Sequence, residues 1–66
     1  MKLTKKAKNA MEKTLNYYKE MHTYYYEKGK DVLQQEYYGR YRGTVETLEY
    51  MGLITEEEAN ELMSQL

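Results

Sequence analysis

Glycine is the only strong helix breaker in this chain of 66 residues, because the sequence contains no proline. The four glycines stand at positions 29, 39, 43 and 52, and good helix formers fill the stretches between them. Gly29 and Gly52 each follow a long stretch with helical spacing, as the residue after a helix end often does. We therefore predict an all-α fold with helices over about residues 4–28, 32–51 and 55–65.

The break after the second predicted helix has a specific capping pattern. Gly52 in the left-handed conformation would let Leu53 fold back on Leu48, which is the apolar contact of a Schellman motif. After this break, a capping box is predicted between Thr55 and Glu58, with Ile54 as the hydrophobic staple on Ala59. At the start of the second helix, Asp31 and Gln34 predict a similar N-terminal cap.

Two rows of apolar and small residues predict that the first two helices pack against each other. The row in the first helix follows alternating steps of four and three, and comprises Ala7, Met11, Thr14, Tyr18, Met21 and Tyr25. The row in the second helix comprises Tyr38, Tyr41, Val45 and Leu48. Residues 1–13 carry five lysines and residues 46–66 carry six glutamates, so an antiparallel arrangement places opposite charges together. We predict an antiparallel helical hairpin followed by a short C-terminal third helix, forming a single helical domain over residues 1–66.

The small size of the chain favours self-association. A domain of this length buries only about 60% of the surface that its unfolded chain exposes. The sequence has no cysteine, so disulfides cannot supply the missing stability, and we predict a homodimer through the first helix and its tyrosine face. The longest apolar run is far shorter than the roughly 18 residues of a membrane span, and the lysine-rich start leads into no apolar core of a signal peptide. We therefore predict a cytoplasmic protein that does not enter a membrane.

Nine tyrosines stand in a chain that has no phenylalanine and no tryptophan. A tyrosine ring can be buried, but its hydroxyl must reach water or a hydrogen-bond partner. The tyrosines at 17–18, 24–26 and 37–38 occupy consecutive helical positions, which diverge by about 100°, so one core cannot accept all of them. Because tyrosine and arginine are enriched at interfaces, we expect some rings to form an interaction surface. The alternative is a small core whose rings extend their hydroxyls to solvent.

The segment 37–43 of the second predicted helix concentrates these features. Its tyrosines and arginines surround Gly39 and Gly43, and a glycine inside a helix costs roughly 1 kcal/mol relative to alanine. The two glycines share a face with Val32, Glu46 and Tyr50, which gives a smooth strip on which another backbone or ring can lie. Tight packing of the strip against the first or third helix is the alternative. The predicted interaction surface comprises Tyr24, Tyr25, Tyr37, Tyr38, Gly39, Arg40, Tyr41, Arg42 and Gly43.

Nucleic acid is the alternative partner. Arg40 and Arg42 stand among tyrosines, and in such surfaces arginines bind phosphates while aromatic rings stack on unpaired bases. The lysines that would extend the patch are Lys2, Lys5, Lys6 and Lys8. Against this reading, the isoelectric point is about 5.8 and the glutamates of residues 46–66 would repel a phosphate backbone. An acidic decoy for a DNA-binding protein would rest on the same glutamates, but half of them suit the start of a helix.

The residue types of an active site or a metal centre are not grouped in the sequence. His22 is the sole histidine, and it has no second metal ligand three or four residues away. Its nearest acid in sequence, Glu20, falls on another helical face, and the sole serine, Ser64, falls in the last turn. Three short helices also leave little room for a catalytic cleft. We predict no enzymatic activity, no cofactor and no metal, and interpret His22 as a polar residue of the helix seam.

The segment 50–59, YMGLITEEEA, resembles the helix-break-helix ending of small proteins from phages and mobile elements of Gram-positive bacteria. The resemblance implies an accessory protein that blocks, recruits or retunes a host or phage machine, as inhibitors of bacterial defence and adaptors of replication or transcription do. We therefore expect a non-enzymatic protein-interaction module that acts as an inhibitor or adaptor by binding a host protein.

Overall fold

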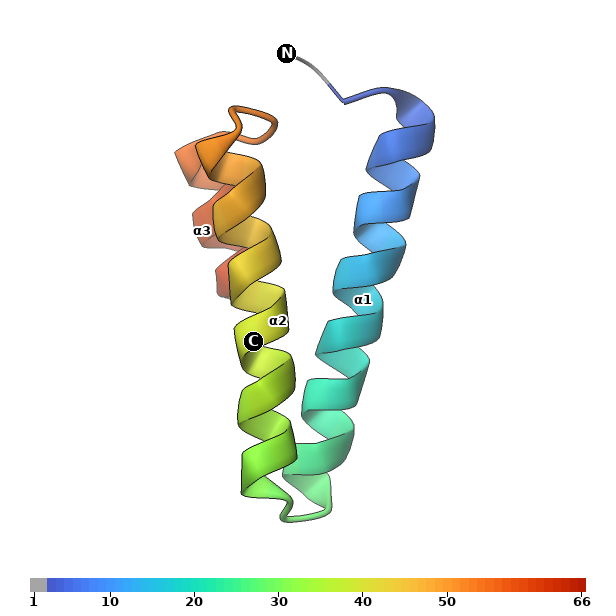
Figure 1. The fold of residues 1–66 in the computed structure, drawn as a ribbon, viewed down its shortest axis with the longest axis vertical. Helices are drawn as coiled ribbons and strands as arrows, with labels where there is room; N and C mark the ends of the chain where they lie inside the picture. The colour runs from blue at the N-terminus through green and yellow to red at the C-terminus, as the bar shows by residue number, and fades with distance from the viewer. Residues whose placement is uncertain (1–2) are drawn as a thin grey trace.

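The computed structural model describes residues 3–66, which form three helices and no strand. They are α1 (Lys5–Glu27), α2 (Asp31–Tyr50) and α3 (Glu56–Met63). Figure 1 shows α1 and α2 as an antiparallel hairpin, with α3 folded back beside the second half of α2. The predicted all-α hairpin with a short third helix is confirmed, and the observed helix ends lie within two residues of the predicted ones.

Both helix breaks are complete Schellman motifs. Gly52 has a φ of 73°, and the N–H of Leu53 donates to the carbonyl of Leu48 over 2.9 Å. Gly29 has a φ of 69°, and the N–H of Lys30 donates to the carbonyl of Tyr25 over 2.9 Å. These left-handed conformations favour glycine, which explains why the chain breaks at these two positions.

The N-terminal cap of α3 agrees with the prediction from the sequence, whereas the cap of α2 does not. Thr55 accepts from the N–H of Glu58 over 3.1 Å, and the Glu58 carboxylate accepts from the N–H of Thr55 over 2.9 Å. This capping box confirms the prediction. The predicted cap at Asp31 is wrong, because Lys30 occupies the N-cap position without a side-chain hydrogen bond and Asp31 is the first helical residue. Asp31 still suits the positive end of the helix.

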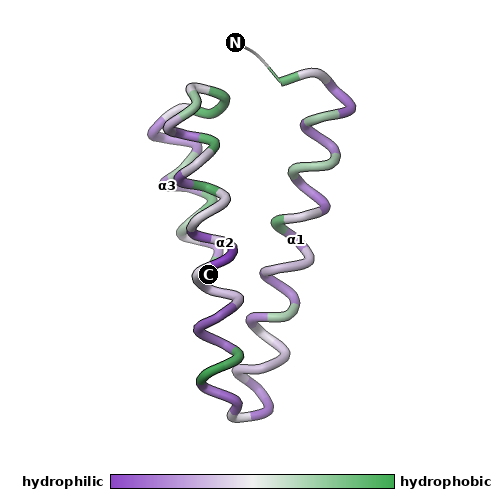
Figure 2. Tube along the Cα trace, viewed as in Figure 1, coloured by the Kyte–Doolittle hydropathy of each residue, from purple (hydrophilic) through white to green (hydrophobic). Residues whose placement is uncertain are grey.

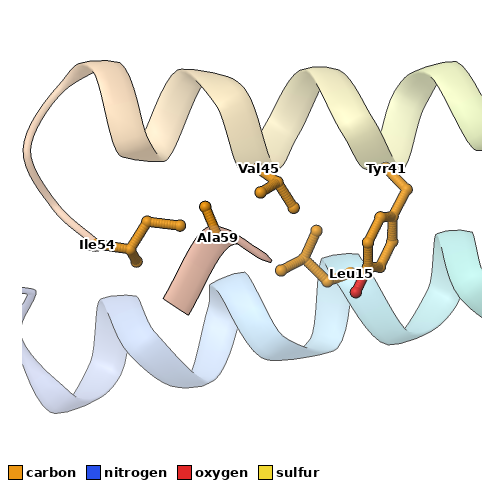
Figure 3. Packing of buried hydrophobic residues seen from close by; sticks show 5 residues of the cluster. All are labelled: Leu15, Tyr41, Val45, Ile54 and Ala59. Atoms are coloured by element: carbon orange, nitrogen blue, oxygen red, sulfur yellow. The ribbon is translucent and has the colours of Figure 1, made fainter. Parts of the chain in front are cut away.

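The hydrophobic core lies in the half of the molecule that is distant from the α1–α2 loop (Figure 3). Its five buried residues are Leu15, Tyr41, Val45, Ile54 and Ala59. Tyr41 is only 1% exposed, and its hydroxyl donates a 2.6 Å hydrogen bond to the carbonyl of Leu62. Burial raises the pKa of Tyr41, so this hydroxyl stays protonated and remains a donor. The predicted place of Tyr41 in the row of the second helix is confirmed, and the prediction that it belongs to an interaction surface is wrong, because its ring lies in the core with Leu15 and Val45 (Figure 3).

The seam of α1 is rotated from the predicted one. Leu15 is the buried residue of this helix, whereas Ala7 and Thr14 of the predicted row are exposed. Met11 and Tyr18 of that row do pack against the core. Small and polar side chains lose little on exposure, so the larger leucine takes the inner position.

The half of the hairpin near the loop has a different composition. Figure 2 shows mostly hydrophilic or intermediate colours along the lower parts of α1 and α2, apart from a hydrophobic stretch at the start of α2. Tyrosine rings, rather than aliphatic side chains, connect the two helices in this region. The aliphatic core and the aromatic contact therefore adjoin along the hairpin, and Tyr18 belongs to both.

Candidate interaction surface

Five tyrosines pack ring against ring on one side of the hairpin. We call Tyr17, Tyr18, Tyr24, Tyr25 and Tyr37 the tyrosine cluster. Tyr37 of α2 is its centre, because its ring centroid lies 6.2 Å from that of Tyr17, 6.2 Å from that of Tyr18 and 5.7 Å from that of Tyr25. Tyr24 joins through Tyr25, with centroids 5.2 Å apart and a nearly perpendicular geometry. Such edge-to-face and offset contacts are the favourable arrangements of aromatic rings.

The cluster has an inner and an outer part. Tyr18, Tyr25 and Tyr37 are half-buried between α1 and α2, whereas Tyr17 is 52% exposed and Tyr24 is 50% exposed. Tyr17 packs against Tyr18 and Tyr37, and Tyr24 packs against Tyr25. These contacts restrict the rotation of the two outer rings while half of each side chain faces solvent. A preorganised aromatic surface loses little side-chain entropy when it binds, which is a property of binding hot spots.

Two cations border the aromatic rings. The guanidinium carbon of Arg40 lies 5.3 Å from the centroid of Tyr37, and the Nζ atom of Lys28 lies 5.7 Å from the centroid of Tyr24. Both distances are in the range of cation–π contacts. Arg40 also donates to a carboxylate oxygen of Glu36 over 3.0 Å, and this pairing raises the pKa of Arg40 and keeps it charged. The cluster therefore has a polar rim around an aromatic centre, as protein interfaces do.

The structure divides the nine residues of the predicted interaction surface into four groups. Tyr24, Tyr25, Tyr37 and Arg40 come together as described. Gly39 and Gly43 border a shallow hollow of about 440 Å³ beside the cluster, which Tyr18, Arg40 and Thr44 also line. Tyr38 and Arg42 lie on the other side of α2, and Tyr41 is in the core.

Two members of the cluster were absent from the predicted surface. Tyr17 and Tyr18 precede Tyr24 and Tyr25 by seven residues each, which is two helical turns. This spacing puts both pairs on the same side of α1. Applied to the sequence, it would have added Tyr17 and Tyr18 to the predicted interaction surface. The choice of Tyr37 over Tyr38 had no comparable signal, because adjacent residues face different directions.

Gly39 and Gly43 of α2 have no close side-chain neighbour among residues 3–66. A Cβ atom added at Gly39 or Gly43 would meet nothing within 4 Å. The alternative that these glycines serve tight packing against α1 or α3 is therefore wrong. No contact within the described residues offsets the roughly 1 kcal/mol that each glycine costs the helix.

The opposite edge of the hairpin holds His22, Tyr26 and Tyr38. The ring centroids of His22 and Tyr38 are 6.1 Å apart, and Nε2 of His22 lies 3.4 Å from Nε2 of Gln34. These residues line an open hollow of about 680 Å³ together with Tyr26, Gln35, Gln65 and Leu66, among others. Within residues 3–66, no three histidine, cysteine or acidic side chains are grouped closely enough to hold a metal ion.

The molecule exposes more surface than its mass requires. Its accessible area is 5153 Å² for a mass of 8.0 kDa. A typical folded monomer of this mass exposes about 4,450 Å². The excess, roughly 700 Å², is close to the area of about 800 Å² that one partner buries in a standard protein interface.

Comparison with protein families, curated proteins and solved structures found no match to this chain. In the part of the chain that the structure describes, no helix combines the length and the apolar character needed to cross a membrane.

Proposed function

We propose that this chain is a small, non-enzymatic interaction module that binds another protein through the tyrosine cluster. The observation that supports this most directly is the pair of half-exposed rings, Tyr17 and Tyr24, held in place by three half-buried tyrosines. Aromatic side chains fixed at the centre of a surface, with an arginine at the rim, are the residues that dominate the energy of protein interfaces.

Charge favours a protein partner over nucleic acid. Arg40 is paired with Glu36, and Arg42 donates to Glu46 over 2.7 Å on the other side of α2, so the two arginines form no common basic patch. Lys5, at the start of α1, is about 28 Å along the helix from Tyr24, and Lys2 lies outside the described residues. A phosphate backbone needs several cations along one track, which this surface does not supply.

The target that we propose is a bacterial or phage protein. This part of the proposal rests on the resemblance of residues 50–59 to proteins of phages and mobile elements. Binding of a small helical module to such a protein would inhibit it or connect it to another component.

The experiment is an affinity capture from a Gram-positive bacterial lysate, with and without nuclease, followed by titration of the captured protein. Tyr17→Ala and Tyr24→Ala each remove a half-exposed ring and leave the aliphatic core intact. We expect each to weaken binding by at least about 10-fold. The matched control is Tyr26→Ala, since Tyr26 is 67% exposed on the same helix but is not part of the tyrosine cluster.

Two results would contradict the proposal. Equal losses for Tyr26→Ala and Tyr24→Ala would show that the tyrosine cluster is not the binding surface. Capture that disappears with nuclease, and that weakens steeply with salt, would instead support binding to nucleic acid.

A further inference from the structure

The outer face of α2 carries two large side chains that no other part of residues 3–66 covers. Val32 and Tyr50 are 84% and 93% exposed, and they lie nine residues before and nine residues after the buried Tyr41. Nine residues make two and a half helical turns, so both side chains point directly away from the core. This face borders the tyrosine cluster, because Gly39 and Gly43 line one hollow with Tyr18, but it includes none of the five clustered rings.

The face has nearly the same pattern in both chain directions about Tyr41. Arginine stands one residue to each side, glycine two residues to each side, and glutamate five residues to each side. The charged residues form two ion pairs within the helix, Arg40 with Glu36 and Arg42 with Glu46. The face is therefore electrically neutral and symmetric, with a large exposed side chain at each end.

A surface with this symmetry is complementary to itself. If two α2 helices lie antiparallel about a two-fold axis beside Tyr41, Val32 of one copy meets Tyr50 of the other at both ends of the contact. The glutamates do not oppose each other across the contact. A line along the outer face of α2 from Val32 to Tyr50 has Glu36 on one side and Glu46 on the other. Each instead lies across from an uncharged residue of the second copy, Thr47 for Glu36 and Gln35 for Glu46. A two-fold interface of this kind uses the same patch on both subunits.

We propose that a second copy of this chain docks on the outer face of α2, antiparallel, with Val32 against Tyr50 at each end and the two Arg–Glu pairs along the sides. At the centre, Gly39 lies opposite Gly43 of the second copy. The absence of Cβ atoms there lets the two helix axes approach to about 8 Å, the lower end of the usual range. The proposed contact uses none of the five tyrosines of the cluster, although Arg40 borders both surfaces.

Charge and area both favour a second copy as the occupant. Two copies of the lysine-rich start of α1, or of the start of α3 with Glu56, Glu57 and Glu58, would repel each other, whereas the outer face of α2 has no net charge. The surface in excess of that of a typical monomer, roughly 700 Å², is close to one side of a standard interface. The dimer predicted from the sequence used the first helix, whereas the proposed contact uses α2.

Cysteine cross-linking tests both the contact and its direction, because the chain has no cysteine of its own. Val32→Cys and Tyr50→Cys are prepared as separate proteins, and both positions are exposed enough to leave the fold intact. Under mild oxidation, we expect each protein alone to form little disulfide-linked dimer, because positions 32 and 32 of an antiparallel pair lie about 27 Å apart. A mixture of the two should form the linked heterodimer efficiently.

Sedimentation equilibrium provides the second measurement. We expect the unmodified chain to dimerise reversibly, and Tyr50→Lys to weaken the dimer by at least about 10-fold, with Tyr26→Lys as a control of matched chemistry. Efficient cross-linking of either single variant with itself would overturn the antiparallel arrangement. A chain that remains monomeric up to about 1 mM would overturn the proposal as a whole.

Discussion

Replacing Gly39 and Gly43 by alanine should stabilise the isolated chain. Both glycines lie inside α2, and the positive φ angles of the chain are at Gly29 and Gly52 instead. A methyl group at either position meets no atom within 4 Å, so it creates no clash. Alanine is favoured over glycine in a helix interior by about 0.8–1.0 kcal/mol, so the double variant should gain nearly 2 kcal/mol in its free energy of unfolding. For a chain of this size, that gain raises the Tm by roughly 8–16 °C.

The assay is thermal unfolding followed by circular dichroism, at a concentration where sedimentation shows a monomer. Gly52→Ala is the matched control, because the φ of 73° at Gly52 strains any residue with a Cβ and should lower the Tm. An unchanged or lower Tm for the Gly39→Ala/Gly43→Ala variant in dilute solution would refute the conclusion that these glycines have no structural role in the single chain. At high concentration the same variant should dimerise less, because its methyl groups would separate the two α2 helices at their closest approach.

Two further predictions concern the attachment of α3. Tyr41→Phe should lower the free energy of unfolding by about 1 kcal/mol, because it removes the 2.6 Å hydrogen bond from the hydroxyl, while the carbonyl of Leu62 retains the 3.2 Å bond from the N–H of Gln65; urea unfolding measures this, and an unchanged midpoint would contradict it. The hydrogen bonds from Thr55 lower the pKa of Glu58 below its ordinary value of 4.5. The stability that Glu58 contributes is therefore fully present above pH 4.5. It is lost as the pH falls through the lower pKa that Glu58 has in the folded state. The Tm of the unmodified chain should therefore fall more over this range than that of Glu58→Gln.

Local features of the fold could be predicted from the sequence because their chemistry is local. The left-handed break at Gly52 and the capping box of Thr55 with Glu58 each depend on residues within a few positions of each other. Asp31 was misplaced by one residue, since the side chain alone does not distinguish the N-cap from the first helical position. Helix ends are defined no more closely than this by sequence patterns.

Tertiary features were less predictable. Tyr41 was assigned both to the packing row of the second helix and to the interaction surface, and the partner that fixes its hydroxyl inside, the carbonyl of Leu62, comes close only through the return of α3. The predicted row of α1 included Thr14, whereas Leu15, one residue further on, was placed beside that row rather than in it. For consecutive residues with similar side chains, such as Tyr37 and Tyr38, the facing of each ring depends on the exact rotation of the helix against its neighbour.

The two proposed contacts are compatible, and their geometry has a consequence for binding. The proposed two-fold axis lies in the α2–α2 interface and is perpendicular to both helices. Rotation about this axis reverses the direction of α2, but a residue on one lateral side of the helix pair stays on that side. Tyr37 and Arg40 lie on one lateral side of α2, between the core and the outer face. The dimer therefore presents both tyrosine clusters on the same side, where a partner with two equivalent sites would contact them together. The second contact would then form at a high effective concentration, which increases the overall affinity without any new residue contact.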